Sequence, residues 1–141
     1  MPALQTSPTV HEAVVVDRRE PYPGIVVIGC HAPELARASR PGQFLMVVPP
    51  SGERVAPALG IYEAEGKRIS FIFVVAGPRT RELALLESGD GIALLGPLGN
   101  GFALDELGDD AALVAGGVGS ASLLLPARQL LARGARVSLY Y

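Results

Sequence analysis

Residues 111–121 read Ala-Ala-Leu-Val-Ala-Gly-Gly-Val-Gly-Ser-Ala, and this stretch defines the architecture of the C-terminal part of the chain. Ala111–Ala115 is an apolar run, which is typical of a strand buried on both faces. Gly116–Gly119 is a glycine-rich turn, and Ser120–Arg133 has a helical pattern. Arg136–Tyr140 returns to the pattern of a strand. The sequence therefore predicts one β-α-β unit with a glycine turn after its first strand.

The glycine turn is a candidate nucleotide site because of its place between a predicted strand and a predicted helix. Gly117 and Gly119 would let the backbone approach a pyrophosphate, and the helix start would offer free N–H groups. The third glycine of the full dinucleotide fingerprint is replaced by Ser122, and residues 137–141 contain no acidic residue to hold a ribose. A tight β-α turn without a ligand therefore remains an equal alternative.

The residues before this unit have the pattern of a small barrel. Short segments rich in Val and Ile alternate with Gly and Pro turns, which predicts a mainly β fold with a six-stranded antiparallel Greek-key barrel. A helix over Thr80–Glu87, with Thr80 as its N-cap, is expected to cover the barrel. The predicted strands are Val10–Arg18, Gly24–Gly29, Phe44–Val48, Ala58–Glu63, Arg68–Val75 and Gly91–Leu95.

The composition excludes several classes of protein. The chain has 141 residues, 49% of them hydrophobic, with 12 basic and 14 acidic side chains, so it is too apolar and too weakly charged for a disordered protein. One cysteine excludes a disulfide scaffold. The net charge of −2, without runs of Lys or Arg, argues against nucleic acid as a partner. No apolar run is long enough to span a membrane, and residues 1–9 lack the pattern of a secretory signal, so a cytoplasmic setting is expected.

An acidic segment, Leu107–Asp110, divides the chain into a predicted barrel domain, residues 1–105, and an incomplete nucleotide-binding domain, residues 106–141. Two parallel strands and one helix leave an apolar sheet face uncovered, whereas open doubly wound sheets usually have five or six strands. We therefore expect either a longer protein or another element that covers this edge.

Three other features have alternative interpretations. The segment Gly77-Pro78-Arg79-Thr80 would suit a phosphate, but an ordinary N-cap is the simpler interpretation. The glycines of Gly96–Phe102 indicate either a backbone pressed against a large flat group or a compact turn between domains. Cys30 ends an apolar strand and is expected to be buried, and neither His11 nor His31 has partners at metal-binding spacing. No general base can be nominated.

Four motifs taken together resemble those of the ferredoxin-reductase-like flavoproteins, and among these the electron-transfer subunits of NAD-dependent dihydroorotate dehydrogenases. They are Pro41-Gly42-Gln43-Phe44, Gly77-x-x-Thr80, Gly96-Pro97-Leu98-Gly99-Asn100-Gly101-Phe102, and Ala115–Ala121.

The resemblance implies an FAD-binding barrel followed by an NAD-binding domain, with FAD between the two. It also implies a hetero-oligomer in which a catalytic dehydrogenase subunit carrying FMN oxidises dihydroorotate in pyrimidine synthesis. Electrons would pass through a 2Fe-2S cluster to FAD and then to NAD. This chain lacks the cysteine-rich segment that holds the cluster in the family.

The resemblance also implies a set of cofactor-binding residues. Three of them depart from the family pattern, and one of these is Arg79, which replaces the second Gly of the family's Gly-x-Gly-Thr stretch. The phosphate-binding Arg of the flavin signature is Pro57 here, and its hydroxyl residue is Gly60; each lost contact is worth about 1.5–3 kcal/mol. Arg79 is a hypothetical replacement for the lost cation. The implied residues are Pro57, Ala58, Leu59, Gly60, Ile72, Phe73, Val74, Gly77, Arg79 and Thr80 for the flavin, and Gly116, Gly117, Gly119 and Ser120 for the nucleotide.

Two further functions stay open at this point. The chain would be a non-catalytic binding or scaffolding module if the changes at Pro57 and Gly60 abolish flavin binding. It would be a reductase of the same superfamily with another redox partner if the rest of the protein lacks a cysteine cluster. Flavin absorbance of the purified protein separates the first alternative from an electron-transfer flavoprotein.

Overall fold

Six antiparallel strands close into a barrel in the order β1-β2-β5-β4-β3-β6, as the sequence predicts. The structure is a computed structural model and describes residues 8–52 and 55–141. Most of the segment in which no secretory signal is expected, residues 1–7, lies outside the described residues. The strands are β1 (Thr9–Tyr22), β2 (Ile25–His31), β3 (Phe44–Val48), β4 (Ala58–Glu65), β5 (Arg68–Val74) and β6 (Gly91–Leu98).

The barrel core is built from the inward-facing residues of all six strands. Phe71 and Ile28 are among its largest fully buried side chains, and Cys30 is also completely buried, which confirms the prediction for this residue. Burial raises the pKa of the Cys30 thiol to about 12, so the reactive thiolate is disfavoured. Buried and more exposed residues alternate along β3 and β6 with the period of two expected of strands, whereas Ile69, Ser70 and Phe71 of β5 are all buried.

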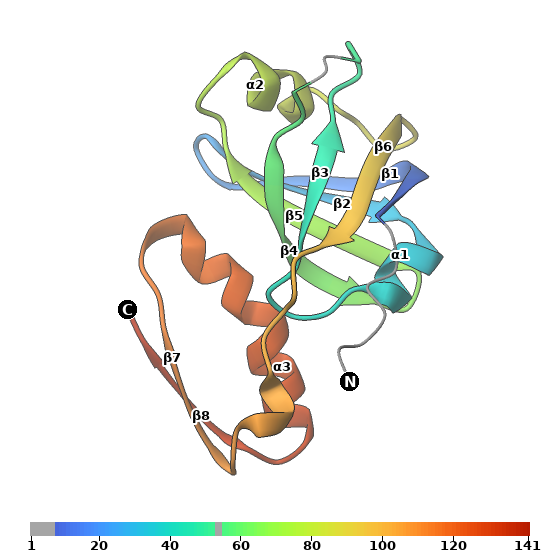
Figure 1. The fold of residues 1–141 in the computed structure, drawn as a ribbon. Coiled ribbons are helices and arrows are strands. Elements are labelled where there is room, and N and C mark those ends of the chain that lie inside the picture. The colour runs from blue at the N-terminus through green and yellow to red at the C-terminus, as the bar shows by residue number, and fades with distance from the viewer. Residues whose placement is uncertain (1–7, 53–54) are drawn as a thin grey trace.

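Two short helices add to the barrel core. The helix α2 (Pro78–Ala84) buries Leu83 in the core, so the expected covering helix is present. It begins earlier than predicted, with Gly77 rather than Thr80 as its N-cap. The helix α1 (Pro33–Ala38) was not predicted from the sequence, because six residues are too short for a helical period to stand out. It buries Leu35 in the same core, and Figure 1 shows the two helices on different sides of the barrel.

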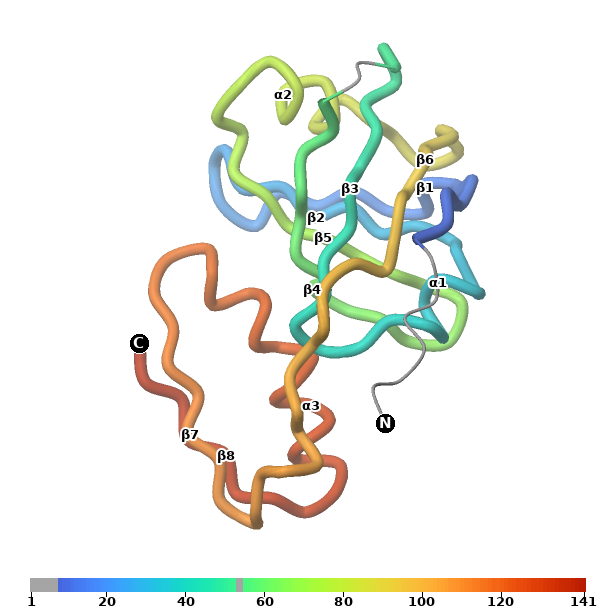
Figure 2. Tube along the Cα trace, viewed as in Figure 1, coloured from blue at the N-terminus to red at the C-terminus, as the bar shows by residue number. Residues whose placement is uncertain are grey.

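After β6 the chain forms a separate, smaller α/β unit (Figures 1 and 2). It consists of the 3₁₀ turn η1 (Leu104–Glu106), strand β7 (Asp110–Val114), the 3₁₀ segment η2 (Gly117–Leu123), helix α3 (Leu124–Ala132) and strand β8 (Arg136–Tyr140). The two strands are parallel, which confirms the β-α-β unit. The expected helix from residue 120 is therefore divided into a 3₁₀ segment and a shorter α-helix.

One expectation about β7 is wrong. Its residues were predicted to be buried on both faces, but Ala112 and Val114, which share one face of the strand, are both exposed, Val114 to 76%. The physical reason is that α3 packs on the sheet through Leu130, which joins Ala111 in a small second core. No other described element covers the opposite face of this two-stranded sheet.

The motif Gly96–Phe102 packs against the motif Pro41–Phe44, although the two are more than 50 residues apart in the chain. The amide of Gln43 donates to the carbonyl oxygen of Gly99 at 2.8 Å, and the Phe102 N–H donates to the Pro41 carbonyl oxygen at 2.8 Å. The ring of Phe44 lies against Gly99. A compact turn that leads from the barrel into the α/β unit thus explains the density of glycines.

We expect Gly101→Ala to destabilise the protein by about 1–2 kcal/mol or more, because an L-residue is strained in left-handed backbone. Gly101 has φ of +74°, and an added Cβ would lie 2.9 Å from the Pro41 carbonyl oxygen. Urea unfolding gives the free energy. Gly108→Ala is the control, since Gly108 lies outside the left-handed region and has open space around it. Equal unfolding midpoints for the two variants would contradict this account of the turn.

Candidate functional site

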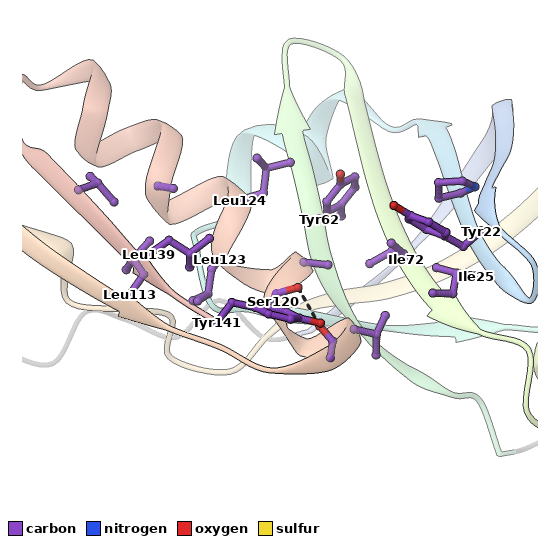
Figure 3. A pocket seen from close by; sticks show the side chains of 16 residues that line it. Tyr22, Ile25, Tyr62, Ile72, Leu113, Ser120, Leu123, Leu124, Leu139 and Tyr141 are labelled. Atoms are coloured by element: carbon purple, nitrogen blue, oxygen red, sulfur yellow. Dashed lines mark hydrogen bonds between the residues drawn. The ribbon is translucent and has the colours of Figure 1, made fainter.

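A cavity of about 610 Å³ lies between the barrel and the α/β unit. This volume is within the range of about 300–1,000 Å³ that small-molecule and cofactor sites occupy. Figure 3 shows the barrel side chains on one side of the cavity and those of the α/β unit on the other. The cavity is lined by Pro21, Tyr22, Ile25, Tyr62, Ile72, Leu113, Gly117, Val118, Ser120, Ala121, Leu123, Leu124, Ala127, Val137, Leu139 and Tyr141.

The barrel wall of the cavity is formed by residues of four consecutive strands of the barrel, β1, β2, β5 and β4. Tyr62 of β4 and Ile72 of β5 project outward because the residues that flank them, Ile61 and Phe71, point into the barrel core. Tyr22 lies at the end of β1, next to the start of β2. Two phenol rings and one aliphatic side chain thus form an apolar wall with two polar hydroxyl ends, a suitable surface for a planar ring system.

The wall on the other side is formed by the α/β unit, at the end of β7 where the glycine turn begins. Ligands of open α/β sheets bind at the carboxyl ends of the strands, and this is where Gly117 and Ser120 lie. The hydroxyl of Ser120 donates to the carbonyl oxygen of Gly117 at 2.8 Å and holds the turn together. Leu123 and Leu124 continue the apolar wall into α3.

The structure brings only part of the implied cofactor-binding set to the cavity itself. Ile72, Gly117 and Ser120 line it. Gly60 is exposed beside it, since an added Cβ there would lie 3.8 Å from the Cβ of Ser122 in η2. Gly60 of β4, from the implied flavin set, therefore lies next to Ser122 of η2 where the barrel meets the α/β unit.

The remaining implied residues lie elsewhere on the barrel and its loops. Phe73 is buried in the barrel core and Leu59 packs against that core, so both would reach an outer ligand only through their main chain. Ala58 and Val74 are exposed. Pro57 precedes β4, Gly77 is the N-cap of α2, and Arg79 and Thr80 lie in the first turn of that helix. Gly116 and Gly119 belong to the glycine turn that leads into η2.

The hydroxyl of Thr80 is fully used within its own turn. It accepts hydrogen bonds from the N–H groups of Ala76 and Gly77, each at 3.0 Å, and donates to the Gly77 carbonyl oxygen at 3.0 Å. A hydroxyl has one donor and two acceptor sites, so none is left for a phosphate. The simpler interpretation of this segment, a helix cap, accounts for every bond that Thr80 makes.

A network of charges joins the barrel to α3 beside the cavity. Arg68 binds Asp17 through two hydrogen bonds of 2.8 and 2.9 Å and Glu63 through one of 3.1 Å. Arg128 of α3 binds the other oxygen of Glu63 at 2.9 Å. Arg19 lies 3.8 Å from the same carboxylate. The side chain of Glu63 is only 17% exposed, so solvent screens this network less than it screens surface pairs.

The same network changes the pKa values of its carboxyl groups. The hydrogen bonds from Arg68 and the positive charges of Arg68 and Arg19 hold the pKa of Asp17 below its usual value. Burial by itself would raise the pKa of Glu63. The hydrogen bonds from Arg68 and Ser70 and the charges of Arg128 and Arg68 outweigh burial, so this pKa is also lowered.

Sequence reasoning missed the aromatic part of the site. Tyr22 was assigned to a turn, and Tyr62 was assigned only to a strand. The strand alternation of β4 places Tyr62 on the outer face together with Gly60, a signal that could have identified it. Nothing in the local pattern shows that Tyr22 meets Tyr62, because that depends on the order of strands in the barrel.

Two further searches covered all the described residues. Within residues 8–52 and 55–141, no three His, Cys, Asp or Glu side chains gather as metal ligands do. No helix in the described part of the chain is long and apolar enough to cross a membrane.

Comparison with known proteins agrees with the fold. No family model matches the chain. It is 39% identical over 95 residues to the electron transfer subunit of dihydroorotate dehydrogenase B (NAD(+)) from Clostridium acetobutylicum, covering 64% of this chain and 37% of the relative. The corresponding subunit from Clostridium perfringens is 37% identical over 89 residues, covering 63% of this chain and 36% of the relative.

Among solved structures, an NADH-dependent reduced ferredoxin-NADP oxidoreductase has a TM-score of 0.80 and 28% identity to this chain. The match covers 90% of this chain and 46% of that one. The chain has the fold of the ferredoxin-reductase-like flavoproteins. It spans less than half the length of these three ferredoxin-reductase-like relatives and resembles the electron transfer subunits in sequence.

We expect acid to destabilise this ferredoxin-reductase-like chain through Asp17 and Glu63. Because their pKa values are lowered by folding, both groups favour the folded state above their unfolded pKa values, and the benefit disappears as the pH falls through the folded values. The free energy of unfolding from urea titrations should therefore decrease between about pH 5 and about pH 2.

The variant Arg68→Met should reduce this decrease, because it removes the main partner of both carboxylates. Arg37→Met is the control, since the guanidinium of Arg37 binds the Pro33 carbonyl oxygen and no carboxylate among residues 8–52 and 55–141. The same acid dependence in wild type and Arg68→Met would show that the network does not couple stability to pH.

Proposed function

We propose that this chain is the flavin-binding part of an electron-transfer protein, in which FAD and a pyridine nucleotide meet in the cavity between barrel and α/β unit. The observation that supports this most is the composition of the cavity. Ile72, from the implied flavin set, and Gly117 and Ser120, from the implied nucleotide set, line the same 610 Å³ space. A ring held on the barrel wall would therefore face the glycine turn directly.

The residues present fit a flavin ring better than they fit its phosphates. The apolar wall of Tyr62, Ile72 and Tyr22 would bury the ring and exclude water from it. Pro57 and Gly60 offer no side-chain donor, and Thr80 has none to spare. Bound flavin would supply the redox chemistry, and this chain would supply binding, orientation and a dry environment.

The names of the relatives support a proposal for the partner and the wider reaction. Curated proteins of this type are named as the electron transfer subunit of dihydroorotate dehydrogenase B (NAD(+)). We infer that the protein to which this chain belongs passes electrons between a catalytic dehydrogenase subunit, which carries FMN, and NAD. Dihydroorotate would be the substrate oxidised, a 2Fe-2S cluster would lie between the two flavins, and the assembly would be a cytoplasmic hetero-oligomer.

A flavin-free binding module is the second candidate, and it has one observation in its favour. Both side chains expected to bind FAD through polar groups at the signature are replaced, by Pro57 and Gly60. The two candidates differ in one measurable property, the affinity of this chain for FAD.

Titration of the chain with FAD, followed by quenching of flavin fluorescence, tests the proposal. We expect saturable binding of one FAD per chain. Ile72→Lys should weaken this binding by about tenfold or more, because it places an unpaired charge in the apolar wall. Val16→Lys is the control, since Val16 lies on the exposed outer face of β1 and does not line the cavity. No binding by the wild-type chain would favour the flavin-free module.

A further inference from the structure

Helix α3 is a wall shared by the barrel, the α/β unit and the cavity. Leu125 is 6% exposed and belongs to the barrel core, whereas Leu130 belongs to the small core beneath β7 and β8. Leu124 and Ala127 line the cavity. The position of this one helix against the barrel therefore determines the width of the cavity.

Arg128 extends from the side of α3 that carries Leu125. Residues three apart share a helix face, so Arg128 lies one turn beyond the buried leucine and reaches β4. Its Nη1 lies 2.9 Å from Oε1 of Glu63. Each partner of this ion pair is adjacent in sequence to a cavity-lining residue, Ala127 on α3 and Tyr62 on β4. The pair thus connects the two walls at the rim of the cavity.

Contacts within the barrel orient the Glu63 carboxylate for its ion pair with Arg128. Its other oxygen, Oε2, accepts from Nη1 of Arg68 at 3.1 Å and from the hydroxyl of Ser70 at 3.3 Å. Arg68 is fixed in turn by its two hydrogen bonds to Asp17. Oε1 is left for Arg128, so little side-chain freedom is lost on the barrel side when the pair forms.

The contribution of Arg128 to overall stability is expected to be small. Its side chain is 52% exposed, against 17% for Glu63, so solvent reaches the Arg128 end of the network more than the Glu63 end, and partly exposed ion pairs contribute little. Leu125 supplies the apolar contact that keeps α3 on the barrel. The Glu63–Arg128 pair joins β4 to α3. It therefore affects the distance between these two walls of the cavity more than it affects the free energy of unfolding.

We propose that the Glu63–Arg128 ion pair is a latch that fixes the separation between the glycine turn and the ring-binding wall of β4 and β5. Arg128 is a positioning residue in this account, and it touches no ligand. The ligand part of the inference rests on the proposed function of the cavity as a cofactor site. The claim about the distance between the two walls needs no ligand and is tested on the chain alone.

The first experiment measures the separation without any ligand. Spin labels at Glu65→Cys on β4 and Gln129→Cys on α3 report the distance between the walls in the whole chain, since both positions are exposed and the single native cysteine, Cys30, is buried. We expect one narrow distance distribution for the otherwise unchanged chain. Arg128→Ala should broaden it towards longer distances, and Arg128→Lys should restore most of the narrow population.

Arg136→Ala is the matched control, because Arg136 pairs with Asp110 inside the α/β unit and not across the cavity. It should leave the distribution unchanged. An unchanged distribution in Arg128→Ala, or the same broadening in Arg136→Ala, would overturn the latch.

The second experiment measures the affinity for FAD by fluorescence titration. If the latch positions the cavity walls, Arg128→Ala should raise the dissociation constant by about tenfold, with Arg128→Lys near wild type and unfolding midpoints nearly equal. Equal affinity in wild type and Arg128→Ala would overturn the latch and leave the proposed function in place. A broadened distance distribution with no FAD binding by wild type would refute the proposed function and support the latch.

Discussion

The burial of Leu125 in the barrel core is the contact on which the functional arrangement depends. This leucine belongs to α3, in the α/β unit, yet it packs among side chains of the barrel. Burial of a leucine contributes about 1.5–3 kcal/mol, which is large beside an exposed ion pair. The contact presses α3 against the barrel and leaves the outer faces of β4 and β5 opposite the glycine turn. The cavity is the space that remains between these surfaces.

The turn from barrel to α/β unit supplies a second constraint on the same arrangement. The backbone of Gly96–Phe102 packs on Pro41–Phe44 with hydrogen bonds from Gln43 and Phe102, so the chain leaves the barrel along a defined path. Glu63 and Arg128 then add an electrostatic contact at the rim. A covalent path, an apolar anchor and a charged pair thus hold the two parts at three separate places. Contacts at three separate places suit a site that must keep two planar groups at a fixed distance.

Much of the fold could be predicted from the sequence, because its elements depend on local patterns. The segments rich in Val and Ile between Gly and Pro turns located the six strands, and the glycine turn at residues 116–119 located the β-α-β unit. Helix α1 was missed because Pro33–Ala38 is too short for a helical period. The burial of β7 was overestimated. An apolar run shows that a strand is able to be buried, but it does not show whether another element packs on each of its faces.

The candidate site was harder to predict because it depends on contacts between distant segments. The glycine turn was named from its motif and Ile72 from the family resemblance, and Gly117 and Ile72 both line the cavity. Tyr62 and Tyr22 come together only through the strand order of the barrel, in which β5 lies between β2 and β4. Glu63 and Arg128 are 65 positions apart, and no local rule pairs them. Thr80 had the chemistry of a phosphate ligand, but its hydrogen bonds within the turn become visible only in three dimensions.

A crystal structure of the chain grown with FAD tests the central claim most directly. The account predicts that the flavin ring lies against Tyr62 and Ile72, with its outer face towards Gly117 and Ser120. A ring bound on any other face of the barrel, or a cavity filled by the protein's own tyrosine side chains with no flavin present, would contradict it.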